Sequence, residues 1–244
     1  MPASDAESDY EERQESVLSA CLSICCGCCC CLSFMNISNP WCLFILYDKT
    51  SSSTSADPAI ANTLAALVGP EAKSGLEAGF APFAIASAQV AASAVRPSTA
   101  AYLNELARSA NAAAASVYCG SVLAGHTSEA DEYGDIAVFL GPGETGVDFG
   151  PGRERDVLDA LGLGHLLQDG HPPERVDLSP TTSLPPTINV PSETGTQLRQ
   201  LVDDLKKLKG THAFCIRGRL TVYFLIGRSD AEGWVGLAGV GVQT

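Results

Sequence analysis

The chain has 244 residues, of which 45% are hydrophobic and 7% aromatic, and its formal net charge is −13. This length suits one medium domain or two small ones with a buried core. Because an acidic chain is repelled by phosphate backbones, we expect no nucleic-acid partner.

The first stretch, residues 1–16, is polar and acidic and has no apolar face. A segment of this composition cannot bury enough apolar surface to fold, so we expect an acidic disordered tail. A secretory signal would begin with basic residues, so we expect none here.

Residues 17–47 contain no charged side chain, and seven of the ten cysteines fall in eleven positions of this stretch. These seven, which we call the cysteine string, are Cys21, Cys25, Cys26, Cys28, Cys29, Cys30 and Cys31. Adjacent cysteines cannot easily bridge one another, and disulfide scaffolds space their cysteines along the chain. We therefore expect a reducing, cytosolic setting.

Four interpretations of the cysteine string are open. S-acylation needs accessible thiols beside an apolar segment, and the string resembles in composition the palmitoylated strings of cysteine-string proteins. An unmodified apolar segment, transmembrane or buried, in which Cys acts as a small hydrophobe is the second; residues 17–35 approach the ~20 residues that cross a bilayer. A zinc site that includes Cys26 and Cys28 lacks a second regular Cys/His pair, and a disulfide cluster is disfavoured by geometry. We expect acylation, and no metal or other cofactor.

A second apolar run, residues 41–47, is too short to span a bilayer and has Trp and Tyr at its ends. Such ends suit a membrane interface. We therefore expect residues 17–47 to be a Cys-rich membrane-attachment segment on the cytoplasmic face, with membrane lipids as partner. The Ser- and Thr-rich residues 48–58 are expected to be a linker.

The remaining residues, 59–244, are expected to form an α+β globular domain that begins with an Ala-rich helical layer. Helices are predicted at about 59–68, within 71–95, and after a Ser98 cap, because Ala favours helix. Residues 76–95 carry Glu77 as their one charge, so insertion of this stretch into a membrane is an alternative.

The middle of the domain gives weaker signals. A strand is predicted at residues 134–140, and a short helix at 153–161 with Val157, Leu158 and Leu161 inward. Residues 168–191 are rich in proline and are expected to be loop.

The last part gives the clearest signals. Leu198, Leu201, Leu205 and Leu208 recur at three- and four-residue intervals and predict an amphipathic helix over 197–209. Three strands should follow, at 212–216, 220–226 and 234–242, as a small antiparallel sheet. The glycines of the last strand weaken it unless something packs closely on them.

Candidate chemistry is sparse. Residues 141–146 match G-x-G-x-x-G, but the residues that follow break an immediate helix, so a turn is expected rather than a dinucleotide site. Glu129, Asp131, Glu132 and Asp135 do not fit a calcium loop and are expected to lie in a solvated loop. A Cys–His nucleophile pair needs spatial contact that sequence cannot establish. The candidates for such a pair are His126, His165, His171, His212, Cys119 and Cys215.

A basic group clusters at the end of the amphipathic helix and in the hairpin that follows. It consists of Lys206, Lys207, Lys209, Arg217 and Arg219. Cations complement the negative end of a helix dipole, which is the ordinary reason for such residues. Contact with anionic lipid headgroups is the functional alternative.

Taken together, the sequence favours a membrane-tethered, non-enzymatic interaction protein attached through S-acylation of the cysteine string. An integral membrane protein, single-pass or hairpin, is one alternative. An enzyme with a site around residues 126–146 is the other.

Overall fold

The computed structural model describes residues 30–35, 43–48, 58–69, 81–87, 90, 95–127, 132–142, 146–168, 170–186, 188 and 195–242. Its strands are β1 (Cys30–Met35), β2 (Leu43–Asp48), β3 (Ala81–Ala86), β4 (Ile136–Gly141), β5 (Glu174–Val176), β6 (Lys209–Ile216), β7 (Thr221–Ser229) and β8 (Gly233–Gly241). Its α-helices are α2 (Pro58–Val68), α3 (Pro97–Ser116), α4 (Glu154–Ala160) and α5 (Thr196–Leu205), with short 3-10 helices at Gly125–Thr127 and Gly164–Leu167.

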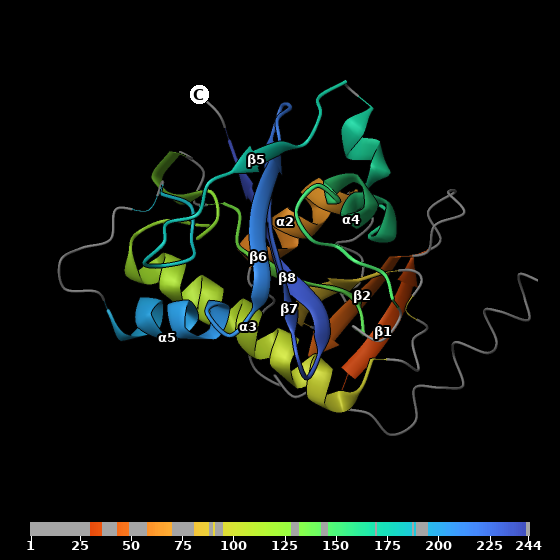
Figure 1. Ribbon diagram of the computed structural model, residues 1–244, viewed down its shortest axis with the longest axis horizontal. Helices are drawn as coiled ribbons and strands as arrows, with labels where there is room; N and C mark the ends of the chain where they lie inside the picture. Colours follow the sequence, from red (N-terminus) through yellow and green to blue (C-terminus); the bar gives the residue numbers. More distant parts are fainter. Residues whose placement is uncertain are drawn as a thin grey trace, which may run out of the picture.

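All of these strands belong to one sheet, in the order β1-β2-β3-β4-β8-β7-β6-β5 (Figure 1). β3 and β4 pair in parallel, with Ala84 opposite Ala137. Parallel neighbours need a crossover connection, and α3 lies in the segment between them. The other neighbouring strands pair antiparallel. The helices and this mixed sheet agree with the expected α+β class.

Helices cover both faces of the sheet. Residues of α3 and α5 pack on one face together with Phe139, Leu225 and Leu237. Residues of α2 and α4 pack on the other face with Val138 and Phe224. Successive residues of a strand point to opposite faces of the sheet. Because helices cover both faces, both alternating sets of side chains in each apolar strand are buried. The prediction that the Ala-rich helices form one layer is therefore wrong, because α2 and α3 lie on opposite faces of the sheet.

The predicted C-terminal elements are confirmed. The leucine stripe forms α5, which ends at Leu205 rather than at residue 209, and the three strands form the antiparallel meander β6-β7-β8. The short helix α4 is also confirmed, with Val157, Leu158 and Leu161 buried. The meander is not a separate small sheet, because β8 also pairs with β4. At Gly236 a side chain would collide with the Leu225 carbonyl, so the close packing on this strand requires glycine.

The helix predicted within residues 71–95 is wrong where the structure describes this stretch. Residues 81–86 form β3 between β2 and β4. Ala84 and Ala86 pack on the face that carries α3, and Ile85 packs on the opposite face. Pairing on both sides of the strand overrides the preference of Ala for helix. This part of the stretch considered for membrane insertion is therefore a sheet strand.

Strand β2 precedes residue 59, where the globular domain is expected to begin. β2 pairs with β1 on one side and with β3 on the other, and its Ile45 and Leu46 are buried. Residues 43–47 of the expected interfacial run thus belong to the folded sheet. A strand buried on both faces and a membrane-facing run have the same continuous apolar pattern. Within the described residues, no helix has the length and apolar character needed to cross a bilayer.

Several sequence predictions lie outside the described residues. They are the acidic tail at 1–16, the part of the attachment segment that comprises 17–29 and 36–42, and the linker at 49–57.

Candidate functional site

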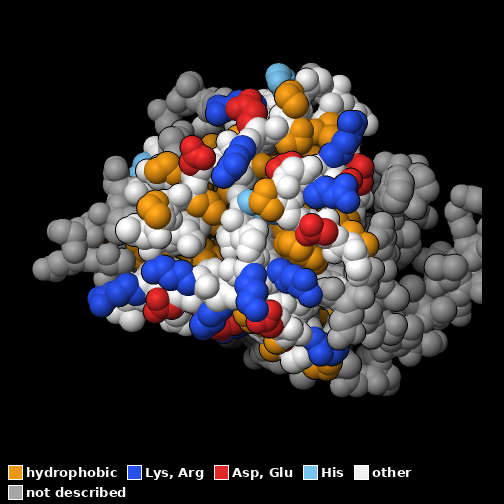
Figure 2. Space-filling model, viewed as in Figure 1, with side chains coloured by type: hydrophobic (Ala, Val, Ile, Leu, Met, Phe, Trp, Pro, Cys, Tyr) orange, Lys and Arg blue, Asp and Glu red, His pale blue; other side chains and the backbone are white. Residues whose placement is uncertain are grey.

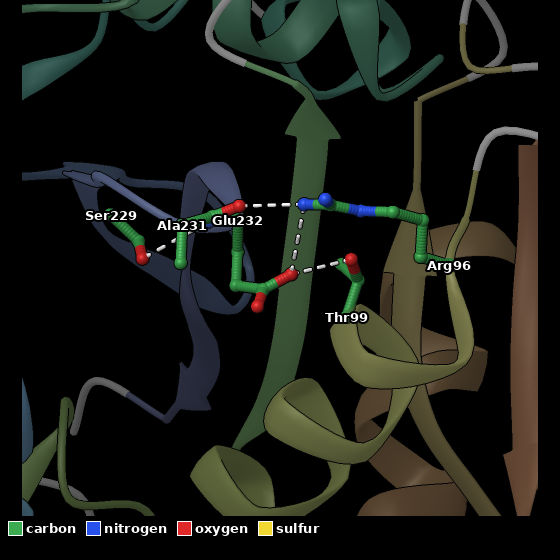
Figure 3. Close-up of polar contacts among 5 residues, drawn as sticks. All are labelled: Arg96, Thr99, Ser229, Ala231 and Glu232. Atoms are coloured by element: carbon green, nitrogen blue, oxygen red, sulfur yellow. Dashed lines mark hydrogen bonds and ion pairs between the residues drawn. The ribbon is translucent and has the colours of Figure 1, made fainter.

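One set of polar contacts joins the first turn of α3 to the turn between β7 and β8. We call it the capping junction; it consists of Arg96, Thr99, Ser229, Ala231 and Glu232 (Figure 3). Thr99 Oγ1 donates a hydrogen bond of 2.5 Å to Glu232 Oε2. Arg96 Nη2 donates one of 2.6 Å to Ala231 O and lies 3.6 Å from the same Glu232 oxygen. The backbone N–H of Glu232 donates to Ser229 Oγ at 3.3 Å.

This junction places a carboxylate beside the first turn of α3, which has no side-chain cap of its own. The helix begins at Pro97 with Arg96 as N-cap, and Arg96 makes no side-chain capping bond. The predicted Ser98 cap is therefore wrong, because Ser98 already lies inside the helix. The Glu232 carboxylate, with a side chain only 12% exposed, faces the positive end of the helix dipole instead. The contact stabilises α3 from a position 133 residues away in sequence.

Tyr102 lies one turn further along α3 and is half-buried. Burial raises its pKa to about 12, and the negative charges of Asp204 and Glu232 act in the same direction. The phenol therefore stays protonated at neutral pH and is not a base. Asp204 is itself engaged, because Lys207 Nζ donates to its Oδ1 at 2.7 Å.

The structure separates the five predicted headgroup-contact residues. Lys206, Lys207 and Lys209 follow the end of α5, while Arg217 and Arg219 lie in the turn after β6. β6 runs between the two groups, and at about 3.3 Å per residue its length holds them about 25 Å apart. Figure 2 shows Lys and Arg side chains along the edge that carries α5, with Asp and Glu among them.

Three of these five cations also have acidic partners. Lys209 Nζ lies 2.6 Å and 2.8 Å from the two carboxylate oxygens of Asp230. Arg217 Nε donates to Glu174 Oε2 at 2.7 Å, and Lys207 is paired with Asp204. A paired cation attracts a lipid headgroup less than a free one does, so the structural role expected for these charges is the better supported one.

The histidines do not converge. His165 and His171 are exposed on separate segments, and exposed His126 has Nε2 2.9 Å from the Val117 carbonyl oxygen. His212 is buried and stacks on Phe214 at a ring-centroid distance of 6.3 Å. It lies in the same strand as Cys215, three residues away, so the two side chains point to opposite faces of the sheet.

The two described cysteines outside β1, Cys119 and Cys215, are buried and not disulfide-bonded. Burial raises the pKa of the Cys215 thiol, which keeps it protonated and unreactive. Among the described residues, no group of three or more His, Cys, Asp or Glu side chains is placed to hold a metal ion.

The prediction that Asp135 lies in a solvated acidic loop is wrong. It is fully buried just before β4, where Ser121 Oγ donates to its Oδ1 at 2.7 Å and the Val122 N–H to its Oδ2 at 2.6 Å. Burial raises its pKa to about 6, although these hydrogen bonds act in the opposite direction. Of the same acidic run, Glu132 is exposed, whereas Glu129 and Asp131 lie outside the described residues.

The glycine-rich segment after β4 does not open a helix. Residues 143–145 lie outside the described part, and the next helix, α4, begins at Glu154. A pyrophosphate cradle needs the helix N-terminus directly after the last glycine. The described residues on either side of 143–145 therefore do not supply the helix that such a cradle needs.

The cysteine string meets the fold at its last two members. Cys30 and Cys31 are the first residues of β1, at one edge of the sheet, whereas Cys21, Cys25, Cys26, Cys28 and Cys29 lie outside the described residues. Five thiols thus precede the sheet and two begin it.

No sequence pattern pointed to the residues that the structure makes most distinctive. Glu232 is one of many surface acids until α3 is placed beside it. Tyr118 stands out only by a positive φ of 58° and an exposure of 91%. Comparisons with protein-family models, with curated protein sequences and with solved structures gave no match.

Proposed function

We propose that this chain is a membrane-tethered, non-enzymatic interaction protein that is attached to the cytoplasmic face through S-acylation of its cysteine string. The observation that carries this proposal is the concentration of seven cysteines in eleven positions of an uncharged stretch. The last two cysteines of the string, Cys30 and Cys31, are the first residues of edge strand β1.

The chemistry of the attachment is a thioester exchange. A cysteine thiolate attacks the carbonyl carbon of an acyl-coenzyme A, the acyl group moves to the cysteine sulfur, and coenzyme A leaves as its thiol after taking up a proton. Each buried CH₂ of the acyl chain contributes about 0.8 kcal/mol of membrane affinity, so two chains give stable attachment. Seven neighbouring thiols supply more than enough acceptors.

The non-enzymatic part of the proposal rests on the arrangement of the reactive residue types. The histidines lie on separate segments, Cys119 and Cys215 are buried, and Asp135 is enclosed by neutral donors. A nucleophile and its base need hydrogen-bond contact in an accessible place. The burial of both cysteines keeps their thiols away from substrate and supports this part of the proposal.

The test is thioester-specific acyl exchange on the full chain expressed in cells. A variant with Cys21, Cys25, Cys26, Cys28 and Cys29 changed to Ser is compared with one in which Cys30 and Cys31 are changed to Ser. We expect a hydroxylamine-sensitive label and membrane fractionation in the wild type, both lost in the five-cysteine variant and largely kept in the two-cysteine variant.

Two results would overturn the proposal. Membrane retention that resists carbonate, without a hydroxylamine-sensitive label, would favour an inserted segment. A wild-type chain that carries no label and stays in the soluble fraction would remove the tether altogether.

A further inference from the structure

The segment between residues 146 and 170, which we call the strap, makes its hydrogen bonds and ion pairs within itself. The structure describes all of it except residue 169. The Gly152 N–H donates to Glu154 Oε1 at 2.9 Å, and α4 with the turns on either side of it supplies the other bonds. Among the described residues, none of these bonds reaches the sheet. The strap is therefore attached to the sheet by other means.

Apolar packing attaches the strap to the sheet face that also carries α2 (Figure 1). The Phe149 ring meets Trp234 of β8 edge to face, with ring centroids 6.1 Å apart. Val157, Leu158 and Leu161 are buried in the same cluster. Apolar contacts have no fixed direction. A segment attached in this way separates from the sheet without breaking a hydrogen-bond ladder.

Each end of the strap has a glycine in the left-handed region. The φ angle is 73° at Gly146 and 77° at Gly170. A side chain at either position would meet no described atom within 4 Å, so packing does not restrain the backbone there. Glycine adopts this and other conformations at little cost, and hinges are a few such positions at the ends of a moving segment. The two glycines are therefore suited to act as hinges.

His212 of β6 lies on the same face of the sheet, in surroundings that favour its neutral form. It is 6% exposed and stacks on Phe214 at a ring-centroid distance of 6.3 Å. Its Nδ1 lies 3.4 Å from Gly210 O, whereas the buried Nε2 has no hydrogen-bond partner among the described residues. A charged imidazole has two N–H donors, so one of them would be buried there without an acceptor. Burial accordingly lowers the pKa of His212 below its ordinary value of 6.5.

The charges that face His212 link it to the strap. Against the larger effect of burial, the pKa of His212 is raised by Glu154 of α4 and by Asp148 of the preceding turn, which both belong to the strap. Arg175 of β5 lowers this pKa, and β7 places the uncharged Ile226 opposite. The folded pKa lies below the unfolded one. The stability that neutral His212 contributes is therefore fully present above pH 6.5 and is lost as the pH falls through the lowered pKa.

We propose that the strap is a hinged lid, which lifts from the sheet when His212 takes up a proton. The proton comes from solvent and binds the unprotonated ring nitrogen, and the charged ring then needs water that the closed strap excludes. Lifting about the two glycines hydrates the ring and exposes Trp234, while the strands of the sheet keep their pairing. No residue of the cysteine string takes part, so the lid acts independently of the proposed tether.

The test follows Trp234 in the purified full chain. The chain has two tryptophans, so Trp41→Phe leaves Trp234 as the one that fluoresces. Acrylamide quenching is measured at pH 7.5 and at pH 5, and far-UV circular dichroism checks that the sheet is kept. We expect the quenching constant to rise about threefold or more at pH 5, as in local opening, with an unchanged dichroism spectrum.

His212→Gln in the same background is the decisive variant, because glutamine can fill much of the same space and stays neutral. Its quenching constant at pH 5 should remain at the value found at pH 7.5. Asp135, whose pKa burial raises to about 6, is present in both proteins, so its titration cancels in the comparison.

Two substitutions in α4 provide a matched pair. Glu154→Gln removes a charge that favours protonated His212 beneath the closed strap, so the rise in quenching between pH 7.5 and pH 5 should be larger than in the parent protein. Asp159→Asn removes an exposed acid of the same helix and should leave the rise unchanged.

Any of three outcomes would overturn the proposal. One is quenching of Trp234 that is the same at both pH values. Another is an equal rise in His212→Gln, which would assign the opening to other groups. The third is a loss of the dichroism signal together with the rise, because the whole sheet would then unfold while the strap has no separate motion.

Discussion

The two ends of α3 are held by different physical means. Its first turn is stabilised by a carboxylate from the β7–β8 turn, through Glu232, Thr99 and Arg96. Its last turns are held by uncharged hydrogen bonds, because Asn111 Nδ2 donates to Asp135 O at 2.7 Å and Asn111 Oδ1 accepts from the Asp135 N–H at 3.0 Å. The first end thus depends on charge and on a distant segment. The second depends on buried polar groups and on a strained turn.

This difference has a consequence for how each end responds to its surroundings. A charge interaction at a partly exposed helix end weakens with added salt. Buried hydrogen bonds are insensitive to salt but costly to break, because a lost partner leaves a group unsatisfied. The predictions that follow probe the two ends separately.

The largest expected effect is a pH dependence at the C-terminal end. The folded chain keeps the Asp135 proton up to a pH of about 6, whereas the unfolded chain releases it near the ordinary aspartate pKa of 3.8. Between these values the unfolded state binds fewer protons, so the contribution of Asp135 to stability falls as pH rises, by about 3 kcal/mol. Urea unfolding at a series of pH values should show this loss in the wild type relative to Asp135→Asn. A difference between the two proteins that stays constant from pH 4 to pH 7 would contradict it.

The next effect is the loss of Asn111, whose side chain also donates to Ala107 O at 2.7 Å. Asn111→Ala breaks three hydrogen bonds and leaves groups at Asp135 unpaired, so we expect a loss of about 2 to 3 kcal/mol in the free energy of unfolding. Arg108→Ala is the control on the same helix, because its exposed pair with Glu105 contributes less than about 1 kcal/mol. Equal losses of unfolding free energy in Asn111→Ala and Arg108→Ala would contradict the larger contribution expected from the Asn111 hydrogen bonds.

At the N-terminal end, Glu232→Ala removes the cap that the β7–β8 turn provides. We expect a loss of about 1 to 2 kcal/mol in the free energy of unfolding, as for a charge at a partly buried helix end, measured by chemical unfolding. The loss should shrink in 1 M salt, whereas that of Asn111→Ala should not. Glu105→Ala, which removes an exposed acid of the same helix, serves as the comparison. A Glu232 effect that is independent of salt would argue against a charge-based cap.

The smallest effect has the opposite sign. Tyr118→Gly should raise the free energy of unfolding by about 1 kcal/mol, because glycine accepts the left-handed conformation without strain. Thermal or urea unfolding would measure it, with Ala112→Gly, in the helix interior, as a control that should destabilise by about the same amount. If Tyr118→Gly destabilises the fold, the ring makes a contribution to stability that its exposure does not indicate.

Local periodicity made the C-terminal half of the fold predictable. The leucine stripe of α5, the apolar strands of the meander and the inward residues of α4 are each set by neighbours in sequence. The same reasoning failed for β3, where Ala84 and Ala86 favour helix until the strands on both sides are known. It also failed for β2, whose apolar residues fit a membrane interface as well as a sheet interior.

The capping junction shows why sites are harder to predict than elements. Thr99 and Glu232 are 133 residues apart, and no local pattern links them. Asp135 resembles its acidic neighbours in sequence. The feature that distinguishes it is the buried apolar strand β4, which begins directly after it. Tyr118 is distinguished mainly by its backbone conformation, which cannot be predicted from one sequence.

The position of β1 has a mechanical consequence. β1 lies at one edge of the sheet and pairs only with β2 among the described strands, from Cys30 opposite Asp48 to Met35 opposite Leu43. Tension applied through the residues before Cys30, directed away from that edge, would break these pairs one after another rather than all together. β8, in contrast, is flanked by β4 and β7 and would have to shear two ladders at once. A tethered copy under load would therefore yield first at β1, while the rest of the sheet keeps its pairing.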